Sequence, residues 1–380
     1  MANPDSRIKV MQIIARMNVG GPAVIVAEII RGLDTSKFEQ ILVTGYCDPD
    51  EADYLETVAT DLSATRIAGL GRSVSPLADL KAFFGLIIFI RKHKPDIIHT
   101  HTAKAGVLGR LASLFAGRGT VRVHTFHGHL LHGYFAGWKK NLIILIERFL
   151  ALFTHRLIAI GNQVKRDLLA AHIGSEEKFR TFFPGLPEPQ EFNKKIARKE
   201  VGFSEEEIYC TFVGRLTKIK RPDRLLDVAA EMKRRNINIV FIVAGEGDLY
   251  EETRDRAMRE DLPVRFLGWR KDIDLLFAAS DIAILTSDNE GIPLTLIQAA
   301  QAKLPIVATS VGSIADIVIH ESNGYLTQPA ALAMADALEK LARDTNLREF
   351  MGASGHVRSH EYFSLERMIN DHADLYRNLK

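Results

Sequence analysis

Residues 286–300 read TSDNEGIPLTLIQAA, and they follow the apolar run at residues 282–285. The run predicts a strand that the polar turn ends, and Pro293 opens an apolar segment with helical spacing, because proline suits the first helical position. A helix that begins where a strand ends offers free backbone N–H groups and a positive dipole end to an anion. The acidic Glu290 beside such a site is explained by a ligand that joins sugar hydroxyls to a phosphate. The carboxylate would accept hydrogen bonds from the hydroxyls while the amides hold the phosphate.

The composition predicts a two-domain globular protein. A chain of 380 residues is long for one hydrophobic core. Its 47% apolar and 25% charged residues are typical of soluble proteins. The net charge of +2 disfavours a general nucleic-acid-binding protein. Cys47 and Cys210 are expected to be reduced and buried, and the N-terminus lacks a secretory signal, so we expect a cytoplasmic protein.

Short β-branched runs alternate with helical patterns along most of the chain. Strands are expected at residues 9–14, 40–44, 96–99, 122–126, 156–160, 209–213, 239–244, 264–267, 282–285 and 306–309. Helices are expected at residues 23–33, 77–92, 105–115, 142–153, 221–234 and 250–260. This alternation predicts an α/β fold with parallel strands and right-handed crossovers, in two Rossmann-like halves.

The best linker candidate is residues 183–189, FPGLPEP, with three prolines and a glycine. Two α/β halves joined there would leave an interdomain cleft faced by the parallel sheets, and ligands favour such clefts and the carboxyl ends of strands. We therefore expect an N-terminal domain at residues 1–186 and a C-terminal domain at residues 187–360. A C-terminal helix within residues 361–380 could pack back on the first domain.

Gly20 and Gly21 follow the first expected strand, where paired glycines let the backbone approach a ligand closely. A plain tight turn is an equal alternative. The segment is not the G-x-G-x-x-G fingerprint of nicotinamide-binding proteins. The pair Gly245 and Gly247 also lacks the third glycine of that fingerprint.

Arg215 and Lys220 lie in the turn after the strand expected at residues 209–213. A guanidinium fork and a mobile ammonium suit a diphosphate, and they would neutralise the charge that builds up as a phosphate leaves. A solvated basic turn is the alternative. Diphosphate binding is favoured over a solvated turn because this turn would face the same cleft as Glu290.

Histidines cluster in the N-terminal half, at His99, His101, His124, His127, His129 and His132. Their spacing matches no zinc motif and no cysteine is nearby, so no metal site is predicted. His127 follows the strand that ends at Phe126 and should point into the cleft, with Gly128 giving close access. There it would serve as a hydrogen-bond donor or a proton shuttle near neutral pH. At least half of the six histidines are expected to be structural.

No segment is apolar and long enough to span a bilayer, although residues 82–90 and 138–153 come partway. Both are expected to be helices packed on a sheet for most of their length. Residues 133–140 combine aromatic side chains with Lys139 and Lys140 in an expected loop. That loop could rest on anionic lipid at the inner membrane face.

Together these motifs resemble those of the retaining glycosyltransferases of family 4, which have the GT-B fold. The matching elements, in chain order, are Gly20-Gly21, His127 within HTFHGH, Gly214-Arg215-Leu216 through Lys220, and an E-x7-E element on Glu290 through Gln298. Each motif is loose alone, but four in order at this spacing are specific for the family. They are not specific for its substrate.

The resemblance implies transfer of a sugar from a UDP- or GDP-type nucleotide diphosphate sugar to a glycan or polyprenyl-linked acceptor. It implies retention at the anomeric carbon by front-face attack, no metal or other cofactor, and a bacterial-type role in cell-surface polysaccharide or glycolipid biosynthesis. The implied catalytic residues are His127, Arg215, Lys220 and Glu290. The implied donor diphosphate and sugar site comprises Gly20, Gly21, Arg215, Lys220, Glu290, Gly291, Ile292, Pro293 and Leu294. The implied nucleoside site comprises Gly268, Trp269 and Gln298.

Gln298 departs from the family pattern, whose second acid usually accepts hydrogen bonds from the ribose. An amide oxygen still accepts, but a charge-assisted hydrogen bond is roughly twice as strong, so donor affinity or nucleotide choice can differ. Two other functions stay open: a nucleotide-sugar epimerase of the same fold, and a non-catalytic nucleotide-sugar-binding protein. A dehydrogenase and a P-loop NTPase are disfavoured because their glycine motifs are absent.

Overall fold

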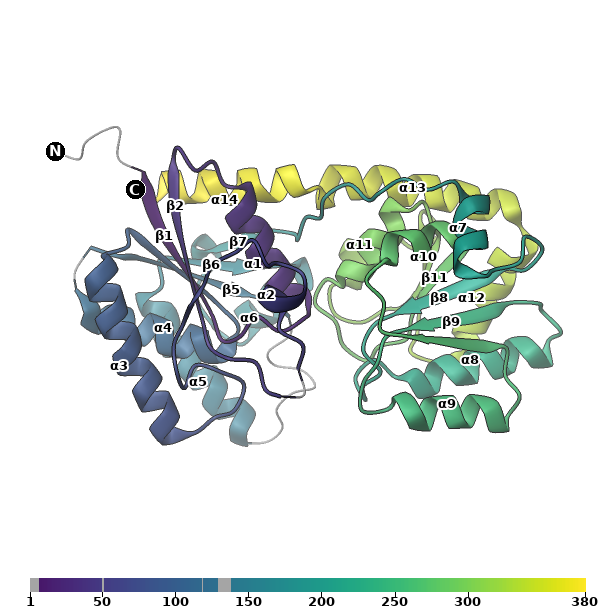
Figure 1. Cartoon of the computed structure of the whole chain (residues 1–380), viewed down its shortest axis with the longest axis horizontal. Coiled ribbons are helices and arrows are strands. Elements are labelled where there is room, and N and C mark those ends of the chain that lie inside the picture. The colour runs from purple at the N-terminus through teal and green to yellow at the C-terminus, as the bar shows by residue number, and fades with distance from the viewer. Residues whose placement is uncertain (1–6, 50, 118, 129–137) are drawn as a thin grey trace. The chain divides into compact units, whose positions relative to one another are not determined.

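The computed structural model describes residues 7–49, 51–117, 119–128 and 138–380, and it divides into two compact units (Figure 1). Unit 1 comprises Met1–Gly185 and Leu365–Lys380, and unit 2 comprises Leu186–Ser364. The first division lies inside the Pro-rich segment at residues 183–189. The second lies four residues beyond position 361, because helix α13 (Thr345–Phe363) stays with unit 2.

Unit 1 is built on a seven-stranded parallel sheet of order β3-β2-β1-β4-β5-β6-β7, a doubly wound arrangement. Its strands are β1 (Ile8–Ile14), β2 (Phe38–Thr44), β3 (Thr65–Arg66), β4 (Ile97–His101), β5 (Val121–Phe126), β6 (Arg156–Ala159) and β7 (Phe179–Thr181). Its helices are α1 (Gly21–Gly32), α2 (Tyr54–Thr57), α3 (Pro76–His93), α4 (Ala103–Ala116), α5 (Trp138–Phe153), α6 (Asn162–Ala170) and α14 (Leu365–Asn378).

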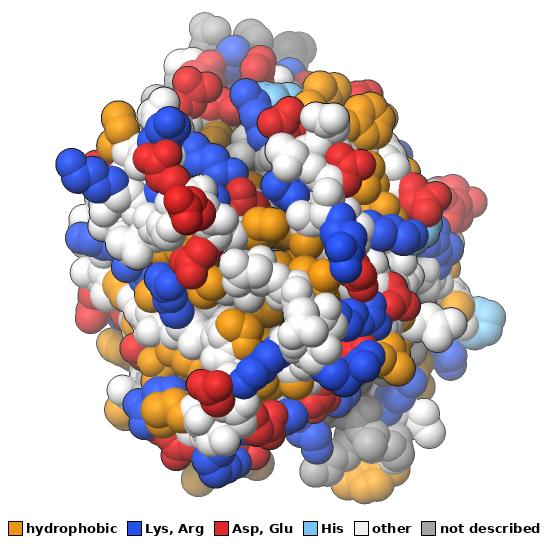
Figure 2. All heavy atoms as spheres, turned by 90° about the vertical axis from the view of Figure 1, so that its right-hand side faces the viewer, with side chains coloured by type: hydrophobic (Ala, Val, Ile, Leu, Met, Phe, Trp, Pro, Cys, Tyr) orange, Lys and Arg blue, Asp and Glu red, His pale blue; other side chains and the backbone are white. Residues whose placement is uncertain are grey.

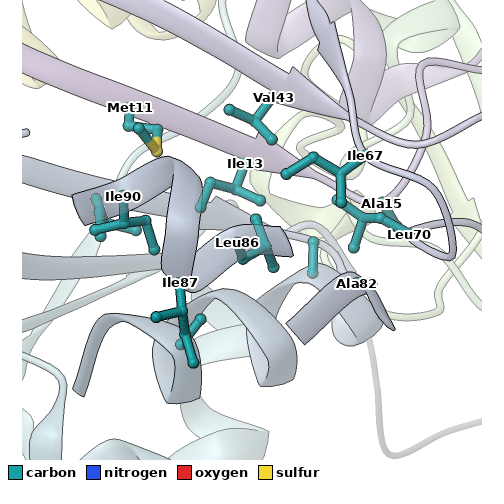
Figure 3. Close-up of a cluster of buried hydrophobic side chains, with 13 residues drawn as sticks. Met11, Ile13, Ala15, Val43, Ile67, Leu70, Ala82, Leu86, Ile87 and Ile90 are labelled. Atoms are coloured by element: carbon teal, nitrogen blue, oxygen red, sulfur yellow. The ribbon is translucent and has the colours of Figure 1, made fainter. Parts of the chain in front are cut away.

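One apolar core of unit 1 joins the sheet to helix α3 (Figure 3). Met11 and Ile13 are two apart on β1 and share a face, because side chains alternate along a strand. Ala82, Leu86 and Ile90 recur every four residues on α3 and so share one helical face. All five are at most 2% exposed, which fixes α3 against this side of the sheet.

The C-terminal helix α14 packs against α1 within unit 1. A Cβ atom on Gly32 would lie 2.5 Å from the side chain of Ile369, so glycine allows this close approach. Further along α14, the ring of Tyr376 meets the edge of Phe38, with ring centroids 6.1 Å apart. The last residues of the chain therefore complete the core that begins at β2.

Unit 2 has a six-stranded parallel sheet of order β10-β9-β8-β11-β12-β13. Its strands are β8 (Tyr209–Val213), β9 (Val240–Ala244), β10 (Val264–Gly268), β11 (Ile282–Leu285), β12 (Ile306–Thr309) and β13 (Gly324–Thr327). Its helices are α7 (Lys194–Val201), α8 (Pro222–Arg234), α9 (Tyr250–Arg259), α10 (Ile273–Ala279), α11 (Leu294–Gln301), α12 (Ala331–Arg343) and α13. The two parallel sheets agree with the expected pair of Rossmann-like halves.

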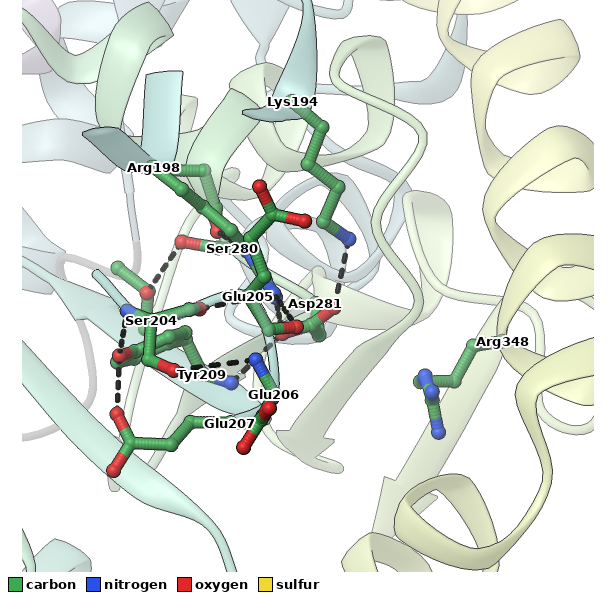
Figure 4. Close-up of polar contacts among 12 residues, drawn as sticks. Lys194, Arg198, Ser204, Glu205, Glu206, Glu207, Tyr209, Ser280, Asp281 and Arg348 are labelled. Atoms are coloured by element: carbon green, nitrogen blue, oxygen red, sulfur yellow. Dashed lines mark hydrogen bonds and ion pairs between the residues drawn. The ribbon is translucent and has the colours of Figure 1, made fainter. Parts of the chain in front are cut away.

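A polar network fastens α7 to the amino ends of β8 and β11 (Figure 4). The carboxylate of Asp281 accepts hydrogen bonds from Lys194 at 2.7 Å, from Arg198 at 2.6 Å and from the backbone N–H of Tyr209 at 2.8 Å. Because Asp281 precedes β11, the network lies at the edge opposite the turns that follow the strands. Its charges are paired with one another, which is typical of a structural role.

Three local expectations differ from the structure. Pro293 is the N-cap of α11 in an extended conformation, so the helix begins one residue later, at Leu294. Trp138 and the two lysines after it are the first residues of α5 rather than a loop, whereas residues 133–137 lie outside the described part of the chain. Cys47 is only partly buried, while Cys210 is fully buried, and both are free thiols.

The surface carries both signs of charge. On the face seen in Figure 2, Lys and Arg side chains are intermixed with Asp and Glu side chains. This mixing agrees with the small net charge of the chain. Within the described residues, no helix combines the length and the hydrophobicity needed to cross a membrane.

Candidate active site

The strongest constellation of unit 2 joins the turns that follow β8 and β11, which are adjacent strands. The Lys220 Nζ atom lies 2.5 Å from Oε1 of Glu290, and the hydroxyl of Ser287 donates to the same oxygen at 2.5 Å. The Lys220 and Glu290 side chains are 21% and 11% exposed. Oε2 of Glu290 makes no hydrogen bond to a described residue, so one carboxylate oxygen is available to a ligand.

The two turns are held together by bonds that leave the Lys220–Glu290 pair little freedom. The Thr286 hydroxyl donates to the carbonyl of Lys220 at 2.8 Å, and the N–H of Asp288 donates to the carbonyl of Ile219 at 2.9 Å. Arg224 and Arg221 lie 2.6 and 3.0 Å from the Asp288 carboxylate. Burial alone would raise the pKa of Asp288, but these guanidinium groups outweigh it and lower the pKa.

Gly245 and Gly247 shape the loop that carries Arg215. A Cβ atom on Gly245, at φ +140°, would lie 2.1 Å from the carbonyl oxygen of Gly214. A Cβ atom on Gly247 would lie 2.4 Å from the carbonyl oxygen of Leu216. The two glycines are therefore needed for packing between neighbouring loops, which explains why they occur without a nicotinamide fingerprint.

Arg215 is exposed, and its guanidinium has no hydrogen-bond or ion-pair partner among the described residues. The structure thus brings Lys220 and Glu290 into contact but leaves Arg215 without such a partner. A cation free of protein partners at a strand-end edge can meet an anionic ligand without first breaking a salt bridge.

The start of α11 supplies backbone donors beside Glu290. The N–H groups of Gly291, Ile292 and Leu294 donate to none of the residues that the structure describes. Gln298 follows Leu294 by one helical turn and is half-buried. The arrangement satisfies the geometry expected of an anion site at a helix start, although Pro293 itself contributes no N–H.

Gly268 is the last residue of β10, and Trp269 begins the turn that follows it. Gly268 has φ +64°, a left-handed conformation that favours glycine, and the Trp269 side chain is 51% exposed. The backbone N–H of Trp269 faces Oε1 of Glu246 at 3.4 Å. Glu246 was not predicted as a site residue, and its only sequence signal is its position in the turn after a strand.

Unit 1 places its predicted residues after β1 and β5, with β4 between these strands. Gly20 is the N-cap of α1, and a Cβ atom there would approach no closer than 3.9 Å to another atom. A Cβ atom on Gly128 would also meet no atom of the described residues within 4 Å. Packing therefore does not demand glycine at these positions, which leaves close ligand approach as a reason for it.

The central histidines form hydrogen bonds within the protein. His99, His101 and His124 are buried, and His101 Nδ1 lies 2.9 Å from His127 Nε2. Burial and then the nearby His372 lower the pKa of His127 to about 3. At neutral pH the ring is therefore uncharged, which favours hydrogen bonding over the proton shuttle that was the alternative. His129 and His132 lie outside the described residues.

Among the described residues, no three His, Cys, Asp or Glu side chains are grouped as a metal ion would require. The chemistry that these residues can perform is recognition of a phosphorylated, hydroxyl-rich ligand. Two cations and free amides suit its phosphates. The Glu290 carboxylate, with Oε2 free of hydrogen bonds to the described residues, suits its hydroxyls.

Comparison with known proteins supports this chemistry. The model described as "Glycosyl transferase 4-like domain" matches residues 20–185, and "Glycosyl transferases group 1" matches residues 193–358. The UDP-Gal:alpha-D-GlcNAc-diphosphoundecaprenol alpha-1,3-galactosyltransferase of Escherichia coli is 26% identical, covering 99% of this chain and 98% of its own. The capsular polysaccharide biosynthesis glycosyltransferase CapM of Staphylococcus aureus is 24% identical, covering 86% of this chain and 88% of its own.

Solved structures show the same fold. Anabaena Alr3699/HepE, in complex with UDP and glucose, superposes with a TM-score of 0.83 at 21% identity, covering 98% of this chain and 100% of that chain. Sucrose-phosphate synthase from Thermosynechococcus elongatus gives a TM-score of 0.83 at 19% identity, covering 98% of this chain and 99% of that chain. With family models matching both units, the chain belongs to the family 4 glycosyltransferases, enzymes of the GT-B fold.

Proposed function

We propose that the protein transfers a sugar from a UDP-sugar to a polyprenyl-linked or other glycan acceptor in cell-surface polysaccharide or glycolipid biosynthesis. The observation that carries the proposal is the Lys220–Glu290 pair, which joins a cation to a carboxylate with one free oxygen. UDP is favoured over GDP because the E. coli relative is described with UDP-Gal and the Anabaena structure holds UDP. The same E. coli relative, whose acceptor is named as a diphosphoundecaprenol, supports a lipid-linked acceptor.

In this proposal, different site residues bind different parts of the nucleotide-sugar donor. Lys220 and Arg215 bind the diphosphate together with the N–H groups of Gly291, Ile292 and Leu294. Glu290 accepts hydrogen bonds from sugar hydroxyls through Oε2. Fixed cations stabilise the negative charge that develops on the leaving phosphate, so the reaction requires no metal.

The acceptor attacks on the face from which the phosphate departs, which retains the anomeric configuration and needs no carboxylate nucleophile. His127, with the Gly20-Gly21 turn, serves the donor sugar and phosphates from unit 1. The nucleoside lies near Gly268, Trp269 and Gln298.

The proposal is tested with a panel of nucleotide sugars. A ligand that binds only the native state at one hundred times its Kd adds about 2.7 kcal/mol of stability, so UDP-sugars should raise Tm more than GDP-sugars. The stabilising donor is then incubated with a polyprenyl diphosphate sugar and excess EDTA, and the product linkage is determined by NMR. Transfer with retained configuration is expected. An inverted linkage, or transfer abolished by EDTA, contradicts the proposal.

Two controls distinguish a transferase from an epimerase and from a non-catalytic binding protein. An epimerase converts the donor in the absence of any acceptor, so a new sugar in that incubation would replace the transferase assignment. A binding protein is stabilised by the nucleotide sugar but neither hydrolyses nor transfers it across a broad set of acceptors.

Gln298→Glu should strengthen UDP binding about fivefold, because a carboxylate would restore the charge-assisted hydrogen bond to the ribose. Gln298→Ala should weaken binding, and calorimetry measures both. The matched ligand is 2′,3′-dideoxy-UDP, which lacks the hydroxyls and should erase the gain. Equal affinities of the Glu, Ala and unchanged proteins for UDP would remove Gln298 from the nucleoside site.

We also propose that unit 1 rests on an anionic membrane through the α3/α5 surface. This surface comprises Leu77, Leu80, Phe84 and Ile88 of α3 with Leu142, Leu145, Phe149 and Leu152 of α5, all exposed. Both helices pack against α4, so they flank it on one side of the sheet. Outward apolar stripes are unusual because the solvent face of a packed helix is normally polar.

The charges of α3 and α5 favour an anionic bilayer as the partner. Lys81, Arg91 and Lys92 of α3 are exposed. The acids of the two helices are occupied: Asp79 pairs with Lys104 at 2.6 Å, and Glu147 pairs with Arg110 at 2.7 Å. Exposed apolar side chains beside unopposed cations are the composition of an interfacial helix. Trp138, the described aromatic residue of the predicted contact at 133–140, is 70% exposed.

Flotation with vesicles of phosphatidylglycerol and phosphatidylcholine tests this surface. The unchanged protein should bind the anionic vesicles, and Leu145→Glu with Leu152→Glu should lower binding at least tenfold. Leu332→Glu on α12 is the matched control, since Leu332 is 61% exposed and Leu145 is 63% exposed. Equal binding to vesicles with and without phosphatidylglycerol would contradict the proposed anionic membrane. Dimerisation that the α5 variant abolishes would assign the surface to a second copy of the chain.

A further inference from the structure

A chain of buried hydrogen bonds leads from the C-terminal helix to His127. The Nε2 atom of His127 lies 2.9 Å from His101 Nδ1, and His101 Nε2 lies 2.8 Å from Oε1 of Gln12. The Gln12 amide nitrogen donates to the hydroxyl of Tyr376 at 3.1 Å. We call these four residues the buried hydrogen-bond chain.

The sheet and α14 fix the buried hydrogen-bond chain in place. Gln12 on β1 is the register partner of His99 on β4, and these strands are neighbours. The Tyr376 hydroxyl also lies 2.6 Å from His99 Nδ1, and His99 Nε2 lies 2.7 Å from the Thr125 hydroxyl. Gln12, His99, His101 and Tyr376 have no exposed surface, so each donor needs a protein acceptor.

The histidines of the chain are neutral. Burial and neighbouring histidines hold the pKa of His101 well below its usual value, and burial lowers that of His127 to about 3. Burial also raises the pKa of the Tyr376 hydroxyl, which therefore keeps its proton. Each neutral imidazole has one N–H and one bare nitrogen, so one hydrogen bond decides the role of the next.

Counting protons along the chain gives the state of His127. Oε1 of Gln12 only accepts, so His101 carries its proton on Nε2 and accepts on Nδ1. His127 must then carry its proton on Nε2 and donate it to His101. Nδ1 of His127 is left as a bare acceptor, and it is buried without a hydrogen-bond partner among the described residues.

The orientation of the Gln12 amide sets this direction. In the observed orientation both amide hydrogens are used, one by Tyr376 and one by Oε1 of Gln40 at 3.3 Å. Turning the amide over would point its NH₂ group at His101, which offers one acceptor atom, Nε2. One amide hydrogen would then have no partner. Tyr376 and Gln40 together therefore hold Gln12 with its oxygen towards His101.

We infer that Gln12 and Tyr376 are positioning residues that fix His127 in the tautomer with a bare Nδ1, which accepts a hydrogen bond from a hydroxyl of the bound sugar. This inference rests on the proposed function, in which His127 serves the donor sugar. An unpaired buried acceptor is unfavourable, and a ligand hydroxyl would satisfy it. A sugar lacking the hydroxyl would leave it unpaired, so the tautomer also confers selectivity.

Nitrogen NMR of ¹⁵N-histidine-labelled protein tests the inference without substrate. The His127 signals, assigned by their loss in His127→Asn, should show the proton on Nε2. Gln12→Met and Tyr376→Phe should each give a mixture of tautomers. Gln12→Glu keeps an acceptor towards His101 and should restore the Nε2-protonated form. A wild-type proton on Nδ1, or a tautomer unchanged in Gln12→Met and Tyr376→Phe, overturns the inference.

Kinetics provide the second readout. Gln12→Met should lower kcat/KM about tenfold while the Kd for UDP stays within twofold, and Gln12→Glu should recover most of the loss. Thr100→Val is the matched control, because it removes a buried 2.9 Å hydrogen bond to His124 outside the chain. It should lower Tm comparably without changing the tautomer. Because the NMR result needs no transfer, its failure is distinguishable from failure of the proposed function.

Discussion

Replacing Lys220 with alanine is expected to lower kcat by about 10²–10³-fold with the fold of unit 2 intact. The ammonium is the cation that contacts Glu290, and in the proposed reaction it also meets the departing diphosphate. Charge develops on that phosphate mainly in the transition state, so the loss should fall on kcat more than on KM. Steady-state kinetics with the identified donor and a thermal melt give both quantities.

Companion variants separate loss of the cation from exposure of the carboxylate. Lys220→Ala also leaves Glu290 without its ion pair, so Glu290→Gln and the double variant complete the cycle. If the unpaired carboxylate caused the whole defect, the double variant would be as active as Glu290→Gln alone, and we expect it to be much less active. Lys218→Ala changes an exposed lysine of the same turn and should stay within about threefold of normal. Near-normal turnover in both Lys220→Ala and Arg215→Ala would contradict the proposal that Lys220 and Arg215 bind the diphosphate.

Lowering the pH from 6.5 to 5.5 is expected to destabilise unit 1 by at least about 2 kcal/mol. Besides the exposed His155, burial lowers the pKa of five histidines of unit 1, namely His99, His101, His124, His127 and His372. Unfolded histidines bind protons near pH 6.5, whereas His372 folded does so at about 4 and His127 at about 3. The unfolded state therefore binds more protons as the pH falls, and His127 and His372 each cost about 1 kcal/mol over this unit of pH. The lowered pKa values of the other three act in the same direction.

Hydrogen exchange at a series of pH values measures the loss of stability separately in unit 1 and unit 2. Protection of β4 and β5 should fall between pH 6.5 and 5.5, before that of β8 and β11. In unit 2 the carboxylates with lowered pKa, such as Glu231 at about 2, lose their contribution only below about pH 4.5. His372→Phe should flatten the pH dependence, whereas replacing the exposed His320 should not. Simultaneous loss of protection in both units would contradict this account.

The main strands were predictable because their apolar runs are continuous. The bounds of β11 and β12 agree with residues 282–285 and 306–309. β3 has two residues and β7 has three, and segments that short carry no periodicity to detect. The start of α11 was misplaced by one residue, since the φ of Pro293 suits both an N-cap and the first helical turn.

The site was predictable as a set of strand-end turns but not as a set of contacts. The sequence placed Lys220 and Glu290 at one edge of a sheet, yet it did not show the contacts of Thr286 with the Lys220 carbonyl and of Ser287 with the Glu290 carboxylate that accompany their pairing. The role of Gly245 and Gly247 was hidden because it depends on carbonyl groups of another loop. Tyr376 could not be linked to Gln12 because the two are 364 residues apart.

The return of α14 to unit 1 has a consequence for how the chain emerges from the ribosome. Unit 2 is one continuous segment and can finish folding once Ser364 has been synthesised. The synthesis of unit 1 begins first, but Tyr376 is made after unit 2. The contacts of Tyr376 with Phe38, Gln12 and His99 can therefore form only after α14 has been synthesised. Unit 2 can therefore be complete before unit 1, although unit 1 is synthesised first, and nascent unit 1 lacks the α14 part of its core while unit 2 is translated.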